Sequence, residues 1–227
     1  MSEAGVRTAL HDRVAVVTLD RPGRRNAIDP ALCIALRDAL HGDADAYVIM
    51  GNGADFCAGF DAHALRAVAD PARFMTEMQS VFEHMEATTR PVVAAVDGYA
   101  LGMGFELALV CDAAVATADA TFGLPEITHG LFPPIAVGRG IDVLGRGWIR
   151  HLAVSGRRWC SGAEAHDLGL VAELAARADL VAAAVSLAAD LAANPAFAAG
   201  KRVSNRGAER AYRMSAETVA PLLRTLA

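Results

Sequence analysis

Residues 96–134 read VDGYALGMGFELALVCDAAVATADATFGLPEITHGLFPP, and the fold class can be inferred from their pattern of apolar residues and glycines. It follows an apolar run at 92–96 that predicts a buried strand, and it turns through glycines into a strongly apolar segment at 103–110. That segment predicts a buried helix, while the short runs at 113–116 and 121–123 predict strands. Strands that alternate with helices in this way indicate an α/β architecture.

The sequence on both sides continues the alternation. Ser161 and Glu164 form a capping-box pattern, and Gly169 is placed to end the helix that the box opens. No linker and no repeat of fixed period divides the chain, so we expect one α/β unit. Apolar periodicity and N-cap residues predict further strands at 14–19 and 47–50, and further helices at 30–40, from 71 onward and at 180–193.

Composition excludes several classes of protein. Of the 227 residues, 54% are hydrophobic and 21% are charged, which indicates a sizeable core rather than disorder. The net charge is −5 and the basic residues are scattered, so we expect no nucleic-acid partner. Apolar runs are too short for a membrane span, and the N-terminus resembles no signal peptide. The four cysteines lie far apart and the histidines form no ligand pattern, which favours a reducing, cytoplasmic setting without a metal.

Glu106 is the first candidate for chemistry, because it is the only acidic or basic side chain between Gly98 and Cys111. Burial among apolar neighbours raises the pKa of a carboxyl group toward neutrality, which suits a general acid or base. The alternative is that the helix turns Glu106 to solvent or pairs it with an arginine.

Glu126 follows Pro125, and its 20-residue distance from Glu106 allows a helix to end and a strand to return. The two carboxylates can therefore approach each other, although a surface or capping role for Glu126 is the alternative. Cys57 has no neighbouring base to activate it, and His129 is expected to be packed or solvated.

The glycine-containing stretches GNGADF (51–56) and GMGFEL (102–107) lack the third glycine of a dinucleotide-binding fingerprint. They share a different feature, because in each a strand runs into a glycine-flanked turn that opens a helix. Such turns leave backbone N–H groups free, and two converging turns would form an oxyanion hole.

Four segments together resemble the enoyl-CoA hydratase/isomerase (crotonase) family. The resemblance implies an α/β fold, a crotonase-like spiral of ββα units over residues 1–160. It also implies C-terminal helices over 161–227 that support trimers and close the site. The segments are VAVVTLDRPGRRNAID (14–29), GADFCAGFD (53–61), the stretch 96–134 and VSGRRWCSGAEAHDLGLV (154–171).

The resemblance also implies residue roles. Glu106 and Glu126 match the two glutamates that hold and activate a water molecule, and the backbone N–H groups of Phe60 and Met103 match the oxyanion hole. The implied reaction adds water to a 2-enoyl-CoA thioester, in a homo-trimer or homo-hexamer that needs no cofactor beyond the CoA of its substrate. Positions that match the contacts to CoA are Ala27, Ala58, Asp61 and either Arg24 or Arg25.

Several departures from the family pattern keep other functions open. Met103 stands where glycine is common, GLFPP (130–134) replaces a glycine-rich continuation, and the C-terminus ETVAPLLRTLA lacks the usual site-closing pattern. Double-bond isomerisation or another enolate reaction such as decarboxylation would need one carboxylate. A non-catalytic subunit of the same fold is the third possibility.

Overall fold

The structure is a computed structural model that describes residues 5–61, 63–64, 70–156 and 159–205. Its largest element is a six-stranded sheet with the strand order β1-β2-β3-β4-β6-β9. β1 is antiparallel to β2, and the remaining neighbours are parallel. The strands are β1 (Val6–His11), β2 (Val14–Leu19), β3 (Ala46–Gly51), β4 (Val92–Val96), β6 (Ala113–Ala116) and β9 (Glu173–Leu174).

A second, three-stranded sheet lies beside the first and carries the turns of the site. Its order is β5-β7-β8, with β5 at Tyr99–Leu101, β7 at Thr121–Gly123 and β8 at Trp159–Ser161. β4 continues into β5 and then into helix α4 (Met103–Val110), and β6 continues into β7 and then into α5 (Pro134–Ser155) by way of the short 3-10 helix η2 (Glu126–His129). These successive strand–strand–helix turns confirm the predicted spiral of ββα units.

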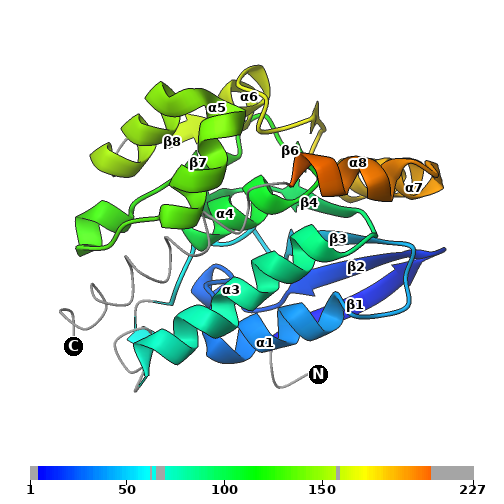
Figure 1. The fold of residues 1–227 in the computed structure, drawn as a ribbon, viewed down its shortest axis with the longest axis horizontal. Coiled ribbons are helices and arrows are strands. Elements are labelled where there is room, and N and C mark those ends of the chain that lie inside the picture. Colours follow the sequence, from blue (N-terminus) through cyan, green and yellow to red (C-terminus); the bar gives the residue numbers. More distant parts are fainter. Residues whose placement is uncertain (1–4, 62, 65–69, 157–158, 206–227) are drawn as a thin grey trace.

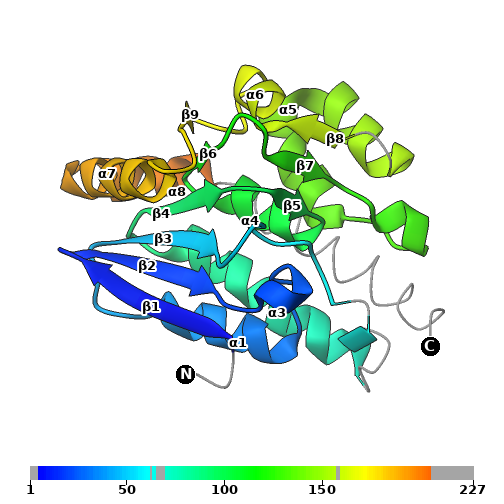
Figure 2. The ribbon, with the colours of Figure 1, turned by 180° about the vertical axis from the view of Figure 1, so that it is seen from behind.

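Both faces of the main sheet are covered by helices (Figures 1 and 2). α1 (Pro30–Ala39), α3 (Pro71–Ala87) and α4 contribute to the core on one face, and α7 (Leu180–Ala193) packs on β3 and β4 from the other. Alternate residues of the strands enter the two cores: Val17 of β2 lies in the first, and Val16 lies in the second. Burial on both faces explains why the central strands are apolar without alternation.

Local capping explains where several helices begin. The carboxylate of Asp29 accepts a hydrogen bond from the backbone N–H of Leu32 at 2.8 Å, which confirms the predicted start of α1. The predicted capping box of Ser161 and Glu164 is formed at the start of α6 (Gly162–Asp167), and Gly169 follows this helix with a φ of +84°. The elements predicted at 14–19, 92–96, 103–110, 113–116, 121–123 and 180–193 all form within those limits.

The region predicted as a C-terminal unit begins inside β8, which pairs with β7 of the second sheet. Its last described helix is α8 (Phe197–Ser204), and residues 206–227 lie outside the described part of the chain. The division at residue 160 therefore stays a prediction.

Among the described helices none is by itself long and apolar enough to cross a bilayer. α7 and α8 meet that criterion only as a pair, and they are bent by 100°.

Candidate active site

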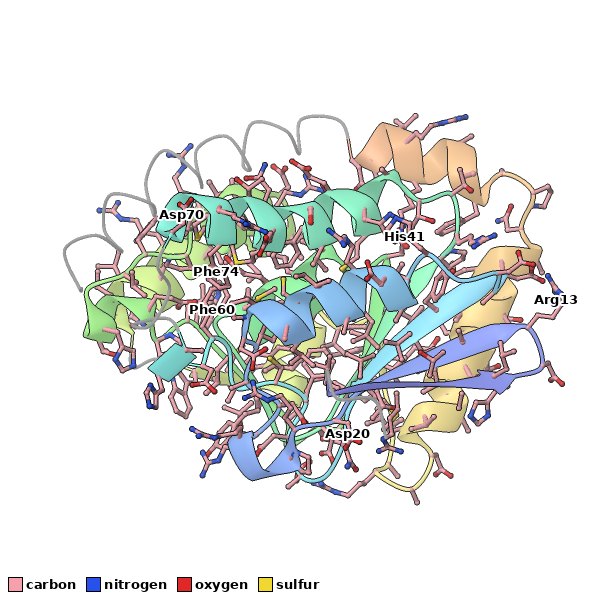
Figure 3. The ribbon with its side chains drawn as sticks, turned by 90° about the horizontal axis from the view of Figure 1, so that it is seen from below. Arg13, Asp20, His41, Phe60, Asp70 and Phe74 are labelled. Atoms are coloured by element: carbon pink, nitrogen blue, oxygen red, sulfur yellow. The ribbon has the colours of Figure 1, made fainter. Side chains whose placement is uncertain are left out.

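The first turn of the site is the segment that contains Gly59 and Phe60. It is held on β5, because the N–H of Cys57 donates to the carbonyl of Tyr99 at 2.8 Å and the N–H of Leu101 donates to the carbonyl of Cys57 at 2.9 Å. A bridge between Ile28 and Phe60 fixes its other side. The aromatic ring of Phe60 packs edge-on against Phe74 of α3, with ring centroids 5.4 Å apart (Figure 3).

The second turn lies at Gly102 and Met103, where β5 becomes α4. The N–H of Gly102 donates to the carbonyl of Gly123 at 2.9 Å, which ties this turn to β7. Gly102 has a φ of +54° and Gly59 a φ of +92°, values that L side chains rarely adopt. A Cβ atom on Gly59 would lie 3.6 Å from the Cα of Gly102, so the two turns touch each other.

Phe60 and Met103 each follow one of these touching glycines. Within the described part of the chain, neither backbone N–H donates to a protein acceptor. Met103 begins α4, and the first N–H groups of a helix have no partner inside the helix. The turns therefore present free donors beside one another. The Met103 side chain is fully buried in the main core.

Glu106 is buried in the first turns of α4, where all eight residues of the helix are buried. One carboxylate oxygen accepts a hydrogen bond from the backbone N–H of Ala136 at 3.0 Å. Burial and the negative charge of Glu126 raise the pKa of Glu106 to about 8, although the Ala136 hydrogen bond acts to lower it. The prediction of a buried carboxyl group with a raised pKa at this position is confirmed, and the alternative of a solvated Glu106 is wrong. Among the described residues no arginine pairs with Glu106.

Glu126 begins η2, directly after Leu124 and Pro125. Its Oε1 lies beside Gly102, 2.8 Å from where a Cβ would stand, which places the carboxylate against the second turn. Oε2 is buried and has no hydrogen-bond partner among the described residues. Burial raises the pKa of Glu126 to about 7.

The structure therefore brings the two carboxylates together across a gap of 20 residues in the sequence. Two buried carboxyl groups with raised pKa values hold about one proton between them near neutral pH. An acid and a base then lie side by side, next to free N–H donors. This arrangement can move protons at a substrate whose carbonyl oxygen is bound by those donors.

The positions matched to CoA contacts gather around the first turn. The N–H of Ala58 donates to the carbonyl of Arg25 at 3.0 Å, and Ala27 is buried beside the bridge between Ile28 and Phe60. The guanidinium of Arg25 is exposed and lies 5.4 Å from the centroid of the Tyr99 ring. The structure places these residues together, while their contact with CoA stays a prediction.

Asp61 has a structural task that the sequence did not indicate. It is 8% exposed, its Oδ1 accepts hydrogen bonds from the N–H groups of His63 and Ala64, and its Oδ2 lies 3.2 Å from Arg21. Burial acts to raise the pKa of Asp61, but these hydrogen bonds and the nearby arginines hold it below its usual value. Arg21 also lies 3.0 Å from Asp29, so one guanidinium joins the two loops.

Asn26 was also missed. It is fully buried with a φ of +53°, and its amide Nδ2 donates to the carbonyls of Asn52 and Asp55 at 3.0 and 2.7 Å. Its Oδ1 accepts from the N–H of Arg21. Asn26 lies in the loop RPGRRNA, where no periodic pattern marks a residue as buried. Asparagine in general adopts a positive φ more readily than most residues.

Other candidates are settled by burial. Cys57 is fully buried, and burial raises the pKa of its thiol to about 12, so it stays protonated and is no nucleophile. His129 is exposed at the end of η2. Within the described ranges, no group of three or more histidine, cysteine or acidic side chains could hold a metal ion.

The ββα spiral and the paired carboxylates are features of crotonase-type proteins. A family model described as enoyl-CoA hydratase/isomerase matches residues 10–222, and the chain belongs to this family. A 2,3-dehydroadipyl-CoA hydratase of Escherichia coli is 36% identical over 168 residues, 71% of this chain and 66% of that protein. A probable enoyl-CoA hydratase of Rhizobium meliloti is 34% identical over 87% of this chain and 79% of its own.

Solved structures show the same fold. An enoyl-CoA hydratase from Mycobacterium avium subsp. paratuberculosis superposes with a TM-score of 0.88 and 26% identity, covering 99% of this chain and 95% of that one. A carnitinyl-CoA dehydratase from Mycobacterium avium 104 superposes with a TM-score of 0.84 and 31% identity, covering 97% and 92%. The likeness thus extends over nearly the whole chain.

Proposed function

We propose that this protein adds water to the Cα–Cβ double bond of a 2-enoyl-CoA thioester. The observation that carries the proposal is the pair of buried Glu106 and half-buried Glu126, whose Oε2 is buried, both with raised pKa values, beside the turns of Phe60 and Met103. Membership of the hydratase/isomerase family supports it. A single carboxylate would suffice for isomerisation or decarboxylation, so the presence of two favours hydration.

In the proposed reaction the two glutamates hold a water molecule between them. The ionised carboxylate takes a proton from the water molecule as the water oxygen bonds to Cβ. The protonated carboxyl group gives its proton to Cα. The pair begins and ends with one proton, and the product is the 3-hydroxyacyl thioester. Because each group changes protonation state once, raised and unequal pKa values suit both roles.

Negative charge develops on the thioester oxygen while the Cβ–O bond forms. We assign its stabilisation to the N–H groups of Phe60 and Met103, since neither has a protein acceptor among the described residues. The loss of one such donor typically costs about 3–4 kcal/mol of transition-state stabilisation. Both donors are backbone groups. The proposed stabilisation therefore depends on the shape of the two turns and not on a particular side chain.

The CoA moiety would bind along the loops that contain Ala27, Ala58 and Asp61. Arg25 supports this assignment, because its guanidinium is 65% exposed and CoA phosphates are anionic. CoA would be part of the substrate, and we propose no further cofactor. We also propose a homo-trimer or homo-hexamer, for which exposed Val154 and Val203 give apolar surface; sedimentation at micromolar concentration would show a single monomeric species if this part is wrong.

Turnover of a panel of enoyl-CoA thioesters tests the proposed reaction. Hydration removes the conjugated enoyl absorbance, and we expect this loss for at least one short or medium acyl chain. Isomerisation of a 3-enoyl-CoA would instead create that absorbance. No change with any thioester, although CoA esters bind in calorimetric titrations, would support the non-catalytic alternative.

A further inference from the structure

A buried ion pair lies outside the site described so far. Arg139 of α5 places Nη2 2.7 Å from Oε1 of Glu86 on α3, and the two side chains are only 16% and 6% exposed. The same nitrogen donates to Oδ1 of Asn205 at 3.2 Å, and Nδ2 of Asn205 donates to the carbonyl of Glu86 at 3.2 Å. These contacts join three segments that are far apart in the sequence.

The position of Arg139 on α5 connects this ion pair to Glu106. Arg139 lies three residues after Ala136, and residues at this spacing lie on nearly the same face of a helix. Ala136 is the residue whose backbone N–H donates to the Glu106 carboxylate. Because both residues belong to one helix, contacts that hold Arg139 also restrict where the N–H of Ala136 lies.

The first turn of α5 is held mainly by apolar packing, since Ile135 and Ala136 are buried in the main core and the helix contacts α4 and η2. The helix enters through Pro133 and Pro134, and Pro133 makes no side-chain capping hydrogen bond. Apolar packing against α4 is not directional, whereas an arginine that meets two fixed acceptors sets both a distance and an angle. A buried ion pair contributes little net stability because of its desolvation cost, so a role in fixing geometry explains it better.

We propose that Arg139 and Glu86 are positioning residues, which lock the first turn of α5 to α3 so that the N–H of Ala136 meets the carboxylate of Glu106. The inference rests on the proposed function, because that function is what requires Glu106 to transfer a proton. Among the described residues, Glu126 is the charged group whose field shifts the pKa of Glu106, and neither Arg139 nor Glu86 does so. The pair thus acts on Glu106 through geometry.

The first test compares Arg139→Met, Arg139→Lys and Glu86→Gln with the wild type. We expect Arg139→Met to lower kcat by about 10- to 100-fold with little change in KM, the scale of a misplaced catalytic group. Arg139→Lys and Glu86→Gln each keep a polar contact, so their kcat should stay much closer to the wild-type value than that of Arg139→Met. The matched control is Arg73→Met. It removes the exposed ion pair between Arg73 and Glu77, both on α3, and should leave kcat unchanged.

The second test needs no turnover. In protein labelled with ¹³C at the glutamate carboxyls, the Glu106 signal is identified by its absence in Glu106→Gln and is titrated with pH. Loss of a hydrogen bond to the carboxylate raises its pKa, so the Glu106 titration in Arg139→Met should move to higher pH. Thermal unfolding checks that each variant is folded at the temperature used.

The two tests separate the inference from the proposed function. A shifted Glu106 titration in a protein that hydrates no thioester would keep the positioning pair and reject hydration. An unshifted titration in folded Arg139→Met, or a wild-type kcat in that variant, would overturn the positioning role. A fall in kcat as large for Arg73→Met as for Arg139→Met would overturn it as well.

Discussion

The carboxylate of Glu126 lies against the Cα of Gly102, so closely that a methyl group on Gly102 would stand 2.8 Å from Oε1. The contact couples this carboxylate to the turn that presents the N–H of Met103. Neither residue can be moved without moving the other. The close approach also explains why a glycine is required here beyond its φ of +54°.

Replacement of this glycine should therefore damage catalysis more than stability. We expect Gly102→Ala to lower kcat by about 10²-fold, because the carboxylate and the turn are pushed apart. Backbone strain should cost about 1–3 kcal/mol of unfolding free energy. Gly169→Ala is the control, since Gly169 has a φ of +84° and no atom near its Cβ position; it should show the strain alone. Equal kcat in both variants would contradict the coupling.

Conversion of either glutamate to glutamine separates the possible reactions. In a hydratase, Glu106→Gln and Glu126→Gln should each lower kcat by about 10²–10⁴-fold while CoA affinity is retained, because an amide cannot exchange the proton. The double variant should lose less than the product of the two factors, since both groups act on one water. Exposed Glu173→Gln is the control and should be silent.

Other outcomes of that experiment point to the alternatives. An isomerase or decarboxylase would show one sensitive glutamate and one that is nearly silent. A non-catalytic subunit would have no turnover to lose. Near-wild-type hydration in either single variant would remove that glutamate from the proposed mechanism.

The raised pKa values predict how stability depends on pH. The pKa of Glu106 rises from 4.5 to about 8 on folding and that of Glu126 from 4.5 to about 7, so the folded protein binds these protons more tightly than the unfolded chain. Below about pH 4.5 both states are protonated and the pair costs nothing. As the pH rises toward 8 the unfolded chain ionises first, and the folded state loses stability.

Glu106→Gln should remove the part of this loss of stability that comes from Glu106. We expect the variant to be more stable than the wild type by a few kcal/mol at about pH 8, with the gain fading toward about pH 4.5. Denaturant unfolding over this pH range measures the difference. A variant that is less stable at every pH, or a gain that does not vary with pH, would contradict burial of the ionised group as the cause.

The sequence predicted the main features that depend on repeated local patterns. Apolar runs marked the central strands, and the isolation of Glu106 in an apolar helix marked its raised pKa. Helix α5 was not predicted, because Gly138, Gly140, Gly145 and Gly147 interrupt its sequence; Gly145 indeed has the non-helical φ of 73° and ψ of 154°. The three-residue strand β5, flanked by glycines, was read as a turn.

Contacts that join distant segments had no local signal at all. The donor to Glu106 is the backbone N–H of Ala136, and a backbone group has no characteristic residue. Arg139 and Glu86 are separated by more than fifty positions, and nothing in either segment marks the other as its partner. The burial of Glu106 could thus be predicted from its apolar neighbours, whereas its hydrogen-bond donor could not.

A buried ion pair also fixes α8, and its loss should be costly. Nζ of Lys201 lies 2.6 Å from Oδ2 of Asp112, and the lysine side chain is 2% exposed. Lys201→Met leaves the buried carboxylate unpaired, so we expect a loss of about 3–5 kcal/mol in unfolding free energy. Arg13→Met, which breaks the exposed pair with Asp45, should leave the unfolding free energy nearly unchanged.

Two further variants separate the charge from the packing in this prediction. Asp112→Asn together with Lys201→Met removes both charges, and it should recover part of the loss because no ion is left unpaired. The Asp112 carboxylate also accepts a hydrogen bond from the N–H of Val92 at 2.8 Å, which an asparagine oxygen can still accept. Equal losses for Lys201→Met and Arg13→Met would show that burial does not set the strength of this pair. A double variant less stable than Lys201→Met alone would assign the loss to the contact between the Lys201 ammonium group and the Phe197 ring instead.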